Sequence, residues 1–161
     1  DPPLPSFPRC GDMIAADSKD GDRMKDDEQL RKLVESQPEY AHHIGARPIS
    51  ATPERVEFEM EVTPLLSNRN GVLHGGAIMG LADNAGGTGT HLHLPEGKAT
   101  TTLESKTNFL RPVRLGDTAR AVAVPLHLGR TTQIWQTTIT RGDGKIAAIV
   151  TQTQMIIDWT D

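Results

Sequence analysis

The sequence predicts a single α+β domain in which one antiparallel sheet wraps one helix. Three observations support this prediction: a strictly alternating stretch, a following segment rich in glycine and alanine, and then four long stretches rich in Thr, Val and Ile. A strand, a small-residue helix and four antiparallel strands in this order are typical of an α+β layout. The length of 161 residues and the hydrophobic content of 36% fit one domain with a sizeable core.

The first 23 residues are rich in Pro, Asp, Gly and Ser and lack a periodic apolar pattern. We therefore expect residues 1–23 to form a flexible or partner-dependent arm, and residues 24–161 to form the domain. Between Met24 and Gln37 the acidic residues come early, two leucines and Val34 share one side, and a proline follows the end. This order predicts a short amphipathic helix.

The alternating stretch, residues 54–62, predicts a half-exposed strand. Its apolar residues, Val56, Phe58, Met60 and Val62, fall on one face, and three glutamates fall on the other. The apolar face is therefore expected to belong to the core.

The segment from His74 to His93 predicts a helix in spite of its six glycines. Each glycine costs about 1 kcal/mol of helix stability relative to alanine, so close approach of the sheet, or of another such helix, is expected to compensate. Asp83 is the one acidic residue of this helix. Its small and apolar neighbours predict that it is shielded from bulk solvent.

Four strands are expected after this helix: Ala99–Phe109, Asp117–Leu128, Thr131–Arg141 and Lys145–Ile157. The connectors between them have the sequences LRPVRLGD, LGRT and RGDG, which are typical of turns between antiparallel neighbours. The Arg-Gly-Asp triplet at residues 141–143 is accordingly interpreted as a hairpin turn and not as an adhesion motif.

The net charge of −4 argues against an overall nucleic-acid or membrane binder, because such proteins usually carry a basic surplus. No apolar run is long enough to span a membrane, and residues 1–10 lack the order of a signal peptide. Residues 98–157 contain eight Lys or Arg against three Asp or Glu. This surplus suits a phosphorylated small ligand, with solvated strand-face charges as the open alternative.

A single cysteine, Cys10, excludes an intrachain disulfide and a cysteine-rich metal site, and it favours a cytoplasmic protein. The histidine pairs His42-His43 and His91-x-His93 lack further ligands at zinc spacing, so no metal site is expected. A serine hydrolase is set aside because the chain has no G-x-S-x-G motif.

The segment Asn68–Asn84, NRNGVLHGGAIMGLADN, has the features of a reactive site. Gly75 and Gly76, after His74, leave backbone N–H groups at a helix start, where the dipole is positive and no side chain blocks a ligand. Such an N–H group would stabilise a developing oxyanion, and Asp83 would then act as general base or nucleophile.

Within one chain, Gly75 and Asp83 are expected to lie too far apart to act on the same carbonyl carbon. Asp83 lies eight residues after Gly75, which is about 12 Å along a helix axis. A carbonyl carbon needs both groups within roughly 3 to 3.5 Å, or one water further. Two antiparallel copies of the helix would bring Gly75 of one subunit to Asp83 of the other, so dimerisation would be required for catalysis.

The same segment, together with the motifs TTLESKTNFLRP, HLGRTT and DGKIAA, resembles the PaaI-like hotdog-fold acyl-CoA thioesterases of the 4-hydroxybenzoyl-CoA thioesterase superfamily. The resemblance covers residues 40–157. It implies a long central helix wrapped by a curved antiparallel sheet, a homodimer that often pairs into a homotetramer, and hydrolysis of an acyl-CoA without any added cofactor.

By motif position, the resemblance assigns the catalytic acid to Asp83 and the oxyanion donor to Gly75. It assigns the amide that positions water or substrate to Asn68, and the orientation of the loop to His74. The polar residue of the next strand, which holds the attacking water or the ligand, falls on Thr102. The loops that contact substrate or CoA fall on Gly76, Phe109, Leu110, Arg111, Pro112, Gly129, Arg130 and Thr131. Two of these, Arg111 and Arg130, would lie near the phosphates.

Three functions remain open from the sequence. A thioesterase uses Asp83 and Gly75 as described. A hotdog hydratase or dehydratase usually needs a histidine and an acid to move two protons, which the single acid after His-Gly-Gly fits poorly. A non-catalytic acyl-CoA-binding module would dispense with the acid. The acyl group, and its contacts with Asp117, Trp135 or Met155, are likewise open.

Overall fold

The computed structural model describes residues 32, 33 and 35–159. The expected arm, residues 1–23, and most of the helix expected from Met24 to Gln37 lie outside the described residues. Residues 32, 33 and 35, at the end of that expected helix, are helical.

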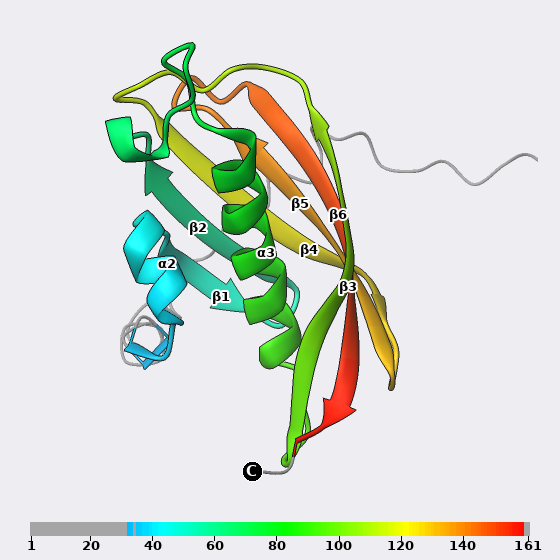
Figure 1. The fold of residues 1–161 in the computed structure, drawn as a ribbon. Helices are drawn as coiled ribbons and strands as arrows, with labels where there is room; N and C mark the ends of the chain where they lie inside the picture. The colour runs from blue at the N-terminus through cyan, green and yellow to red at the C-terminus, as the bar shows by residue number, and fades with distance from the viewer. Residues whose placement is uncertain (1–31, 34, 160–161) are drawn as a thin grey trace, which may run out of the picture.

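A curved antiparallel sheet of six strands wraps the long helix α3 (Gly75–His91), as Figure 1 shows. The strands are β1 (Arg47–Thr52), β2 (Arg55–Glu61), β3 (Lys98–Phe109), β4 (Thr118–Leu128), β5 (Thr132–Thr140) and β6 (Ile146–Asp158). Two short helices, α2 (Glu39–Ile44) and η1 (Pro64–Leu66), flank β1 and β2 in the chain. The predicted α+β layout, one sheet around one helix, is confirmed.

The core lies between α3 and the face of the sheet that it covers. The apolar positions predicted from the alternation in β2 are all at most 1% exposed, and they pack in one cluster with Leu81, Ala82 and Ala85 of α3. The predicted core face of β2 is therefore confirmed, whereas the opposite face is only partly exposed, because Glu57 is itself buried.

Glycines in α3 allow the sheet to approach the helix backbone. A Cβ atom at Gly86 would lie 2.6 Å from the carboxamide carbon of Gln152, and one at Gly89 would lie 2.6 Å from the ring of Trp135. At these two positions, close approach of the sheet is the expected compensation for the lost helix propensity.

Two elements, α2 and β1, were missed by the sequence prediction. β1 is an edge strand that contains Pro48, and its pairing with β2 is irregular between Pro48 and Ser50. Because proline and a bulge interrupt the alternation, the strand leaves no clean period-two pattern.

The prediction that LRPVRLGD joins antiparallel neighbours was wrong. The strand order is β1-β2-β4-β5-β6-β3, so residues 110–117 cross one end of the sheet from its outer edge to β4. β3 pairs instead with β6 along almost its whole length, from Lys98 opposite Asp158 to Phe109 opposite Ala148. The connectors LGRT and RGDG do join neighbours, β4 to β5 and β5 to β6.

Candidate active site

The start of α3 presents an unpaired backbone donor. His74 is the N-cap, and its Nδ1 accepts a hydrogen bond of 2.9 Å from the Gly76 N–H. The Gly75 N–H donates to none of the residues that the structure describes. Because the helix dipole is positive here, this N–H suits an anionic or carbonyl oxygen as its acceptor.

Asn68 shapes the turn that leads into this helix start. Its Oδ1 accepts from the N–H groups of Asn70 at 2.9 Å and Val72 at 3.4 Å, which closes the turn on itself. Within the described part of the chain, no acceptor is recorded for its Nδ2 group. We call Asn68, His74 and Gly75 the donor half-site.

Asp83 lies about two turns further along α3, where two strands hold its carboxylate. Thr102 Oγ1 of β3 donates to Asp83 Oδ1 at 2.8 Å, and Gln152 Nε2 of β6 donates to the same oxygen at 3.3 Å. Gln154 Nε2 donates in turn to Thr102 Oγ1 at 2.9 Å. We call Asp83, Thr102, Gln152 and Gln154 the acid half-site.

A pocket of about 310 Å³ opens beside the acid half-site. It is lined by Leu33, Ser36, Gln37, Pro38, Asp83, Asn84, Gly87, Thr88, His91, Thr100, Thr101, Thr102 and Gln154. Asn84 Nδ2 donates to Gln37 Oε1 at 2.8 Å, which ties the segment before α2 to the helix. The pocket lies at the lower end of the volumes that hold small-molecule ligands.

Asp83 is exposed in the single protomer, so the prediction that it is shielded from bulk solvent was wrong for the isolated protomer. Gly75, Met79, Asp83, Gly87 and His91 follow one another at four-residue spacing, and this stripe of α3 is half-buried or exposed. The two half-sites therefore open on the same side of the helix, away from the core.

The structure brings Asp83 and Thr102 into contact and keeps Asp83 apart from Gly75. The two residues are eight positions apart on the continuous helix α3, which corresponds to about 12 Å. Phe109 lies at the other half-site, since a Cβ atom on Gly75 would be 3.1 Å from its ring. Each protomer thus carries two separate half-sites.

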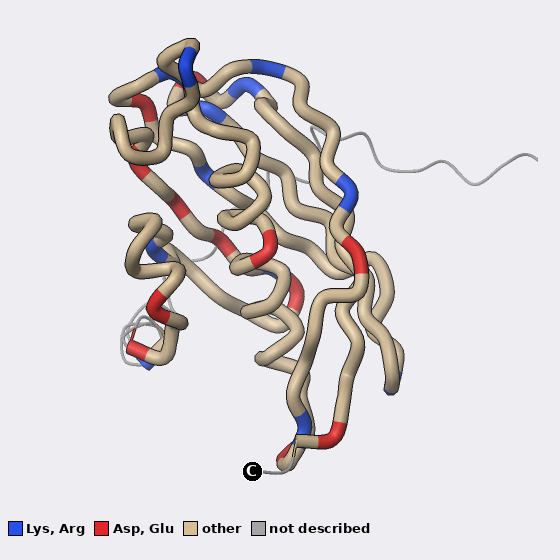
Figure 2. Tube along the Cα trace, in the orientation of Figure 1, with Lys and Arg blue, Asp and Glu red and all other residues tan. Residues whose placement is uncertain are grey.

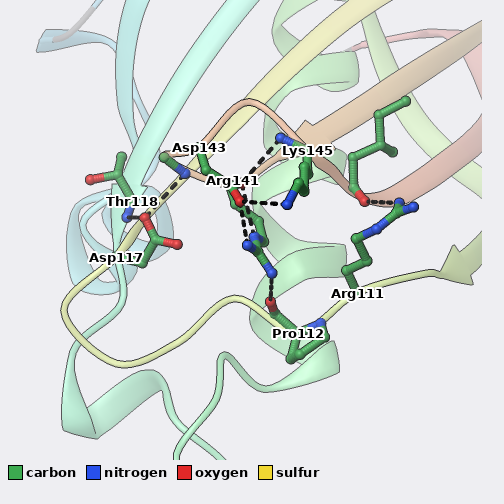
Figure 3. Close-up of polar contacts among 9 residues, drawn as sticks. Arg111, Pro112, Asp117, Thr118, Arg141, Asp143 and Lys145 are labelled. Atoms are coloured by element: carbon green, nitrogen blue, oxygen red, sulfur yellow. Dashed lines mark hydrogen bonds and ion pairs between the residues drawn. The ribbon is translucent and has the colours of Figure 1, made fainter.

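Arg111 lies near the donor half-site, just after β3. Its Nη1 donates to the Ile146 carbonyl at 2.8 Å (Figure 3). The backbone N–H groups of Leu110 and Arg111 both donate to the Ala147 carbonyl. These contacts fasten residues 110 and 111 to the start of β6. Basic residues gather at this end of the molecule, where α3 begins (Figure 2).

The neighbouring hairpin between β5 and β6 is held by its own charges. Arg141 pairs with Asp143, and Arg141 Nη1 also reaches the Pro112 carbonyl at 3.5 Å (Figure 3). The hydrogen bond from Arg141 is the main cause that lowers the pKa of Asp143 to about 2, and the Lys145 N–H and charge add to it. Asp143 in turn raises the pKa of Arg141.

Arg130 lies at the opposite end of the sheet from Arg111. β5 begins with Thr132 opposite Met155, and Met155 lies opposite Thr101 near the start of β3. The hairpin of Gly129, Arg130 and Thr131 is therefore separated from Arg111 by nearly the whole of β3, roughly 35 Å of strand. Within one protomer the two expected CoA-contacting loops do not meet.

Gln152 and Gln154 are site residues that the sequence prediction missed. Both side chains are buried, with 1% of each residue exposed. Their signal in the sequence is the alternation of glutamine with threonine in a strand otherwise rich in Ile, Val and Ala. Polar residues on the core face of a strand indicate a buried partner.

Among the described residues, no group of three or more His, Cys, Asp or Glu side chains is arranged to hold a metal ion. None of the helices in this part of the chain is long and apolar enough to cross a membrane.

Comparisons of the sequence and of the structure with known proteins point to the same family. Residues 70–148 match the model of the thioesterase superfamily. A Haemophilus influenzae protein named as a candidate esterase is 36% identical over 117 residues, which cover 72% of this chain and 83% of that protein. A thioesterase structure from Haemophilus influenzae has a TM-score of 0.76 and 32% identity, and covers 82% of this chain and 92% of its own. The PaaI protein of the E. coli phenylacetic acid degradation operon has a TM-score of 0.74 at 26% identity, over 83% of this chain and 94% of its own.

Proposed function

The chain belongs to the thioesterase superfamily, as a PaaI-like member with the hotdog fold, and from this membership we propose that it hydrolyses acyl-CoA thioesters to the free acid and CoA. One observation carries the proposal. A carboxylate held by two donors beside a pocket, and an unpaired N–H at a helix start, open on the same side of α3. These are the two groups that thioester hydrolysis requires.

The active site that we propose is shared between two protomers that pair along β3. This strand is the sheet edge and is exposed over most of its length, with Leu103 57% and Phe109 55% exposed. A long, unpaired edge strand is a template for pairing with another chain. An antiparallel pair of β3 strands would bring the exposed stripes of the two α3 helices to the same side.

The positions of the half-sites along β3 predict the register of this pair. Asp83 is level with Thr102, and Gly75 is level with Phe109. A twofold axis that sets Gly75 beside the partner's Asp83 would therefore pass close to Ser105, midway between these levels. The same axis creates two equivalent sites.

In this composite site, the thioester carbonyl would accept a hydrogen bond from the Gly75 N–H. The partner's Asp83 would take a proton from a water molecule whose oxygen attacks the carbonyl carbon, and the N–H would stabilise the resulting oxyanion. Collapse of this intermediate breaks the C–S bond, and the partner's Asp83 returns the proton to the departing CoA sulfur, which restores the carboxylate. Direct attack by the Asp83 carboxylate, followed by hydrolysis of the anhydride, uses the same groups.

Basic residues near the donor half-site support CoA as the leaving group. Arg69, Arg111 and Arg114 have no carboxylate partner among the described residues, and all are exposed. Guanidinium groups bind phosphates through paired hydrogen bonds. In the antiparallel dimer the partner's Arg130 would lie at the same end as Arg111, so the two predicted loops would meet across the interface.

Thiol release from a panel of aryl- and fatty-acyl-CoA thioesters tests the proposal. We expect Asp83→Asn to lower kcat by about 10² or more, because it removes the base but keeps the size of the side chain. Turnover by Asp83→Asn equal to that of the wild type, or hydration of an enoyl thioester without thiol release, would contradict the proposed function.

A second pair of variants isolates the oxyanion donor. Gly75→Pro removes the N–H at the first helical position, where proline is tolerated, and the φ of −63° and ψ of 139° at His74 suit a residue before proline. Gly75→Ala adds a similar Cβ atom and keeps the N–H. We expect Gly75→Pro to have a kcat on the order of 10²-fold below that of Gly75→Ala, and equal values would remove the donor from the mechanism.

A further inference from the structure

β6 contributes two buried amide side chains to the acid half-site. Gln152 and Gln154 are each 1% exposed and lie at alternate positions, so both face the interior. Burial of a carboxamide is unfavourable unless its polar atoms form hydrogen bonds. Both side chains direct their N–H donors to Asp83 or to its neighbour Thr102.

The carboxylate sets the direction of the hydrogen bonds that lead to it. An ionised Asp83 can only accept, so the single hydroxyl proton of Thr102 is used in the 2.8 Å bond to Oδ1. The oxygen of that hydroxyl is then free to accept, and Gln154 Nε2 supplies the donor at 2.9 Å. Gln154 Oε1 consequently faces Thr100 Oγ1, which donates at 3.0 Å.

The two oxygens of Asp83 have different surroundings. Oδ1 accepts from both Thr102 and Gln152. Oδ2 receives no hydrogen bond from the residues that the structure describes. The chain of donors therefore occupies one oxygen and leaves the other for a ligand in the pocket.

We propose that Gln154 is a positioning residue, which orients the Thr102 hydroxyl toward Asp83 Oδ1 and so holds the carboxylate with Oδ2 directed to the reacting water or carbonyl. The consequence for turnover rests on the proposed thioesterase function, whereas the orientation of the hydroxyl does not. His91 is the other titratable side chain among the described residues that line the pocket.

Gln154→Met tests this role because it keeps the length of the side chain and removes its donor. We expect kcat to fall roughly three- to tenfold with little change in KM, since the hydrogen bond that orients the Thr102 hydroxyl toward Asp83 is lost. The acidic limb of the pH profile of kcat/KM should move to higher pH, because a carboxylate with fewer donors is protonated more readily. An unchanged acidic limb would contradict the proposal.

Gln133→Met is the matched control. Gln133 lies opposite Gln154 on β5, is 3% exposed, and accepts a hydrogen bond from the Trp135 indole, not from the chain of donors to Asp83. Its replacement removes a buried amide from the same layer, so we expect a loss of stability without a shift of the acidic limb. The same shift in both variants would indicate a merely structural effect and overturn the proposal.

A double-mutant cycle with Thr102→Val tests whether Gln154 acts through Thr102. If it does, Gln154→Met has no further effect on kcat or on the pH profile once the hydroxyl is absent, so the two changes are strongly non-additive. Additive effects would contradict the proposal. If Gln154→Met does not fold, Gln154→Glu serves instead, because its carboxylate accepts the Thr102 proton and turns it away from Asp83.

A carbon-13 NMR titration of the Asp83 carboxyl separates this inference from the proposed function. Protonation of Asp83 should occur at higher pH in Gln154→Met than in the wild type, whether or not any thioester is hydrolysed. A wild type without thioesterase activity would contradict the proposed function alone. An unshifted Asp83 titration would contradict the positioning role alone.

Discussion

Glu57 is a residue at which burial and ion pairing have opposite effects. It lies on the face of β2 opposite Val56 and Phe58, and its side chain is only 10% exposed. Its carboxylate accepts from Arg55 Nε at 2.6 Å and from Arg120 Nε at 3.0 Å. Burial by itself would raise the pKa of Glu57, but the hydrogen bonds and charges of the two arginines outweigh it and lower the pKa below 4.5.

We therefore predict that Glu57→Gln lowers the free energy of unfolding by about 1 kcal/mol at pH 7. A lowered pKa in the folded state means that this stabilisation is complete above pH 4.5 and is lost as Glu57 is protonated below that value. Urea unfolding at pH 7 and pH 3 should show a larger difference between variant and wild type at the higher pH than at the lower.

Glu61→Gln is the control for this prediction, because it removes the same charge from the exposed end of the same strand. Its effect at pH 7 is expected to stay within about 0.5 kcal/mol. Equal destabilisation by the two variants would show that net charge, and not the pairing with Arg55 and Arg120, stabilises the fold.

At the scale of elements, α3 contains glycines with opposite structural roles. At Gly89 a Cβ atom would lie 2.6 Å from the ring of Trp135, which is completely buried and cannot move aside. At Gly87 a Cβ atom would meet no atom of the described residues within 4 Å. The first glycine is required by packing within the protomer, whereas the second lowers the helix propensity and has no close neighbour among the described residues of the protomer.

We predict that Gly89→Ala destabilises the protein by about 1 to 3 kcal/mol through overpacking. Gly87→Ala should stabilise it by about 0.5 to 1 kcal/mol, because alanine restricts the unfolded chain and favours a helix. Thermal unfolding of the two variants, only two residues apart, would show Tm changes of opposite sign. A lower Tm for both would mean that α3 tolerates no side chain at either position.

Elements with a local pattern were predictable from the sequence, and elements defined by distant pairing were not. The alternation in β2 predicted its core face, and the small residues after His74 predicted α3. α2 is only six residues long, and Pro48 interrupts β1. Neither element therefore has a periodic apolar pattern long enough to be recognised in the sequence. The crossing of residues 110–117 depends on the pairing of β3 with β6, which no local turn signal encodes.

The same limit applies to the candidate site. Asp83 and Gly75 were singled out because an acid in a small-residue helix and a glycine at a helix start are local features. Gln152 and Gln154 were missed because their relation to Asp83 arises only when β6 pairs with β3 and both strands face α3. Asp83 is exposed because the sheet covers the opposite side of α3, and no local sequence pattern shows which side of the helix the sheet will cover.

At the scale of the whole molecule, the separation of the half-sites predicts complementation between inactive chains. A dimer of Asp83→Asn chains lacks both bases, and a dimer of Gly75→Pro chains lacks both oxyanion donors. A mixed dimer has one site with an intact Gly75 from one chain and an intact Asp83 from the other. We expect roughly half of the wild-type activity per mixed dimer, measured by thiol release after co-expression with two affinity tags.

The complementation experiment has a clear contrary result. If both groups act within one protomer, every chain in the mixture has a defective site, and the mixed dimer is as inactive as its parents. A mixture of two Asp83→Asn preparations that carry the same tags serves as the control for contamination.

The pairing of β3 with β6 also fixes an order of events during translation. β1 with β2, and β4 with β5, can pair soon after they leave the ribosome, but β3 has to wait for β6, the last strand of the sheet. Until then β3 has no strand partner within the chain, and the glutamines beside Asp83 have not yet been synthesised. A polypeptide released before β6 is made would therefore lack both the pairing partner of β3 and the two glutamines whose amides point to Asp83 and Thr102.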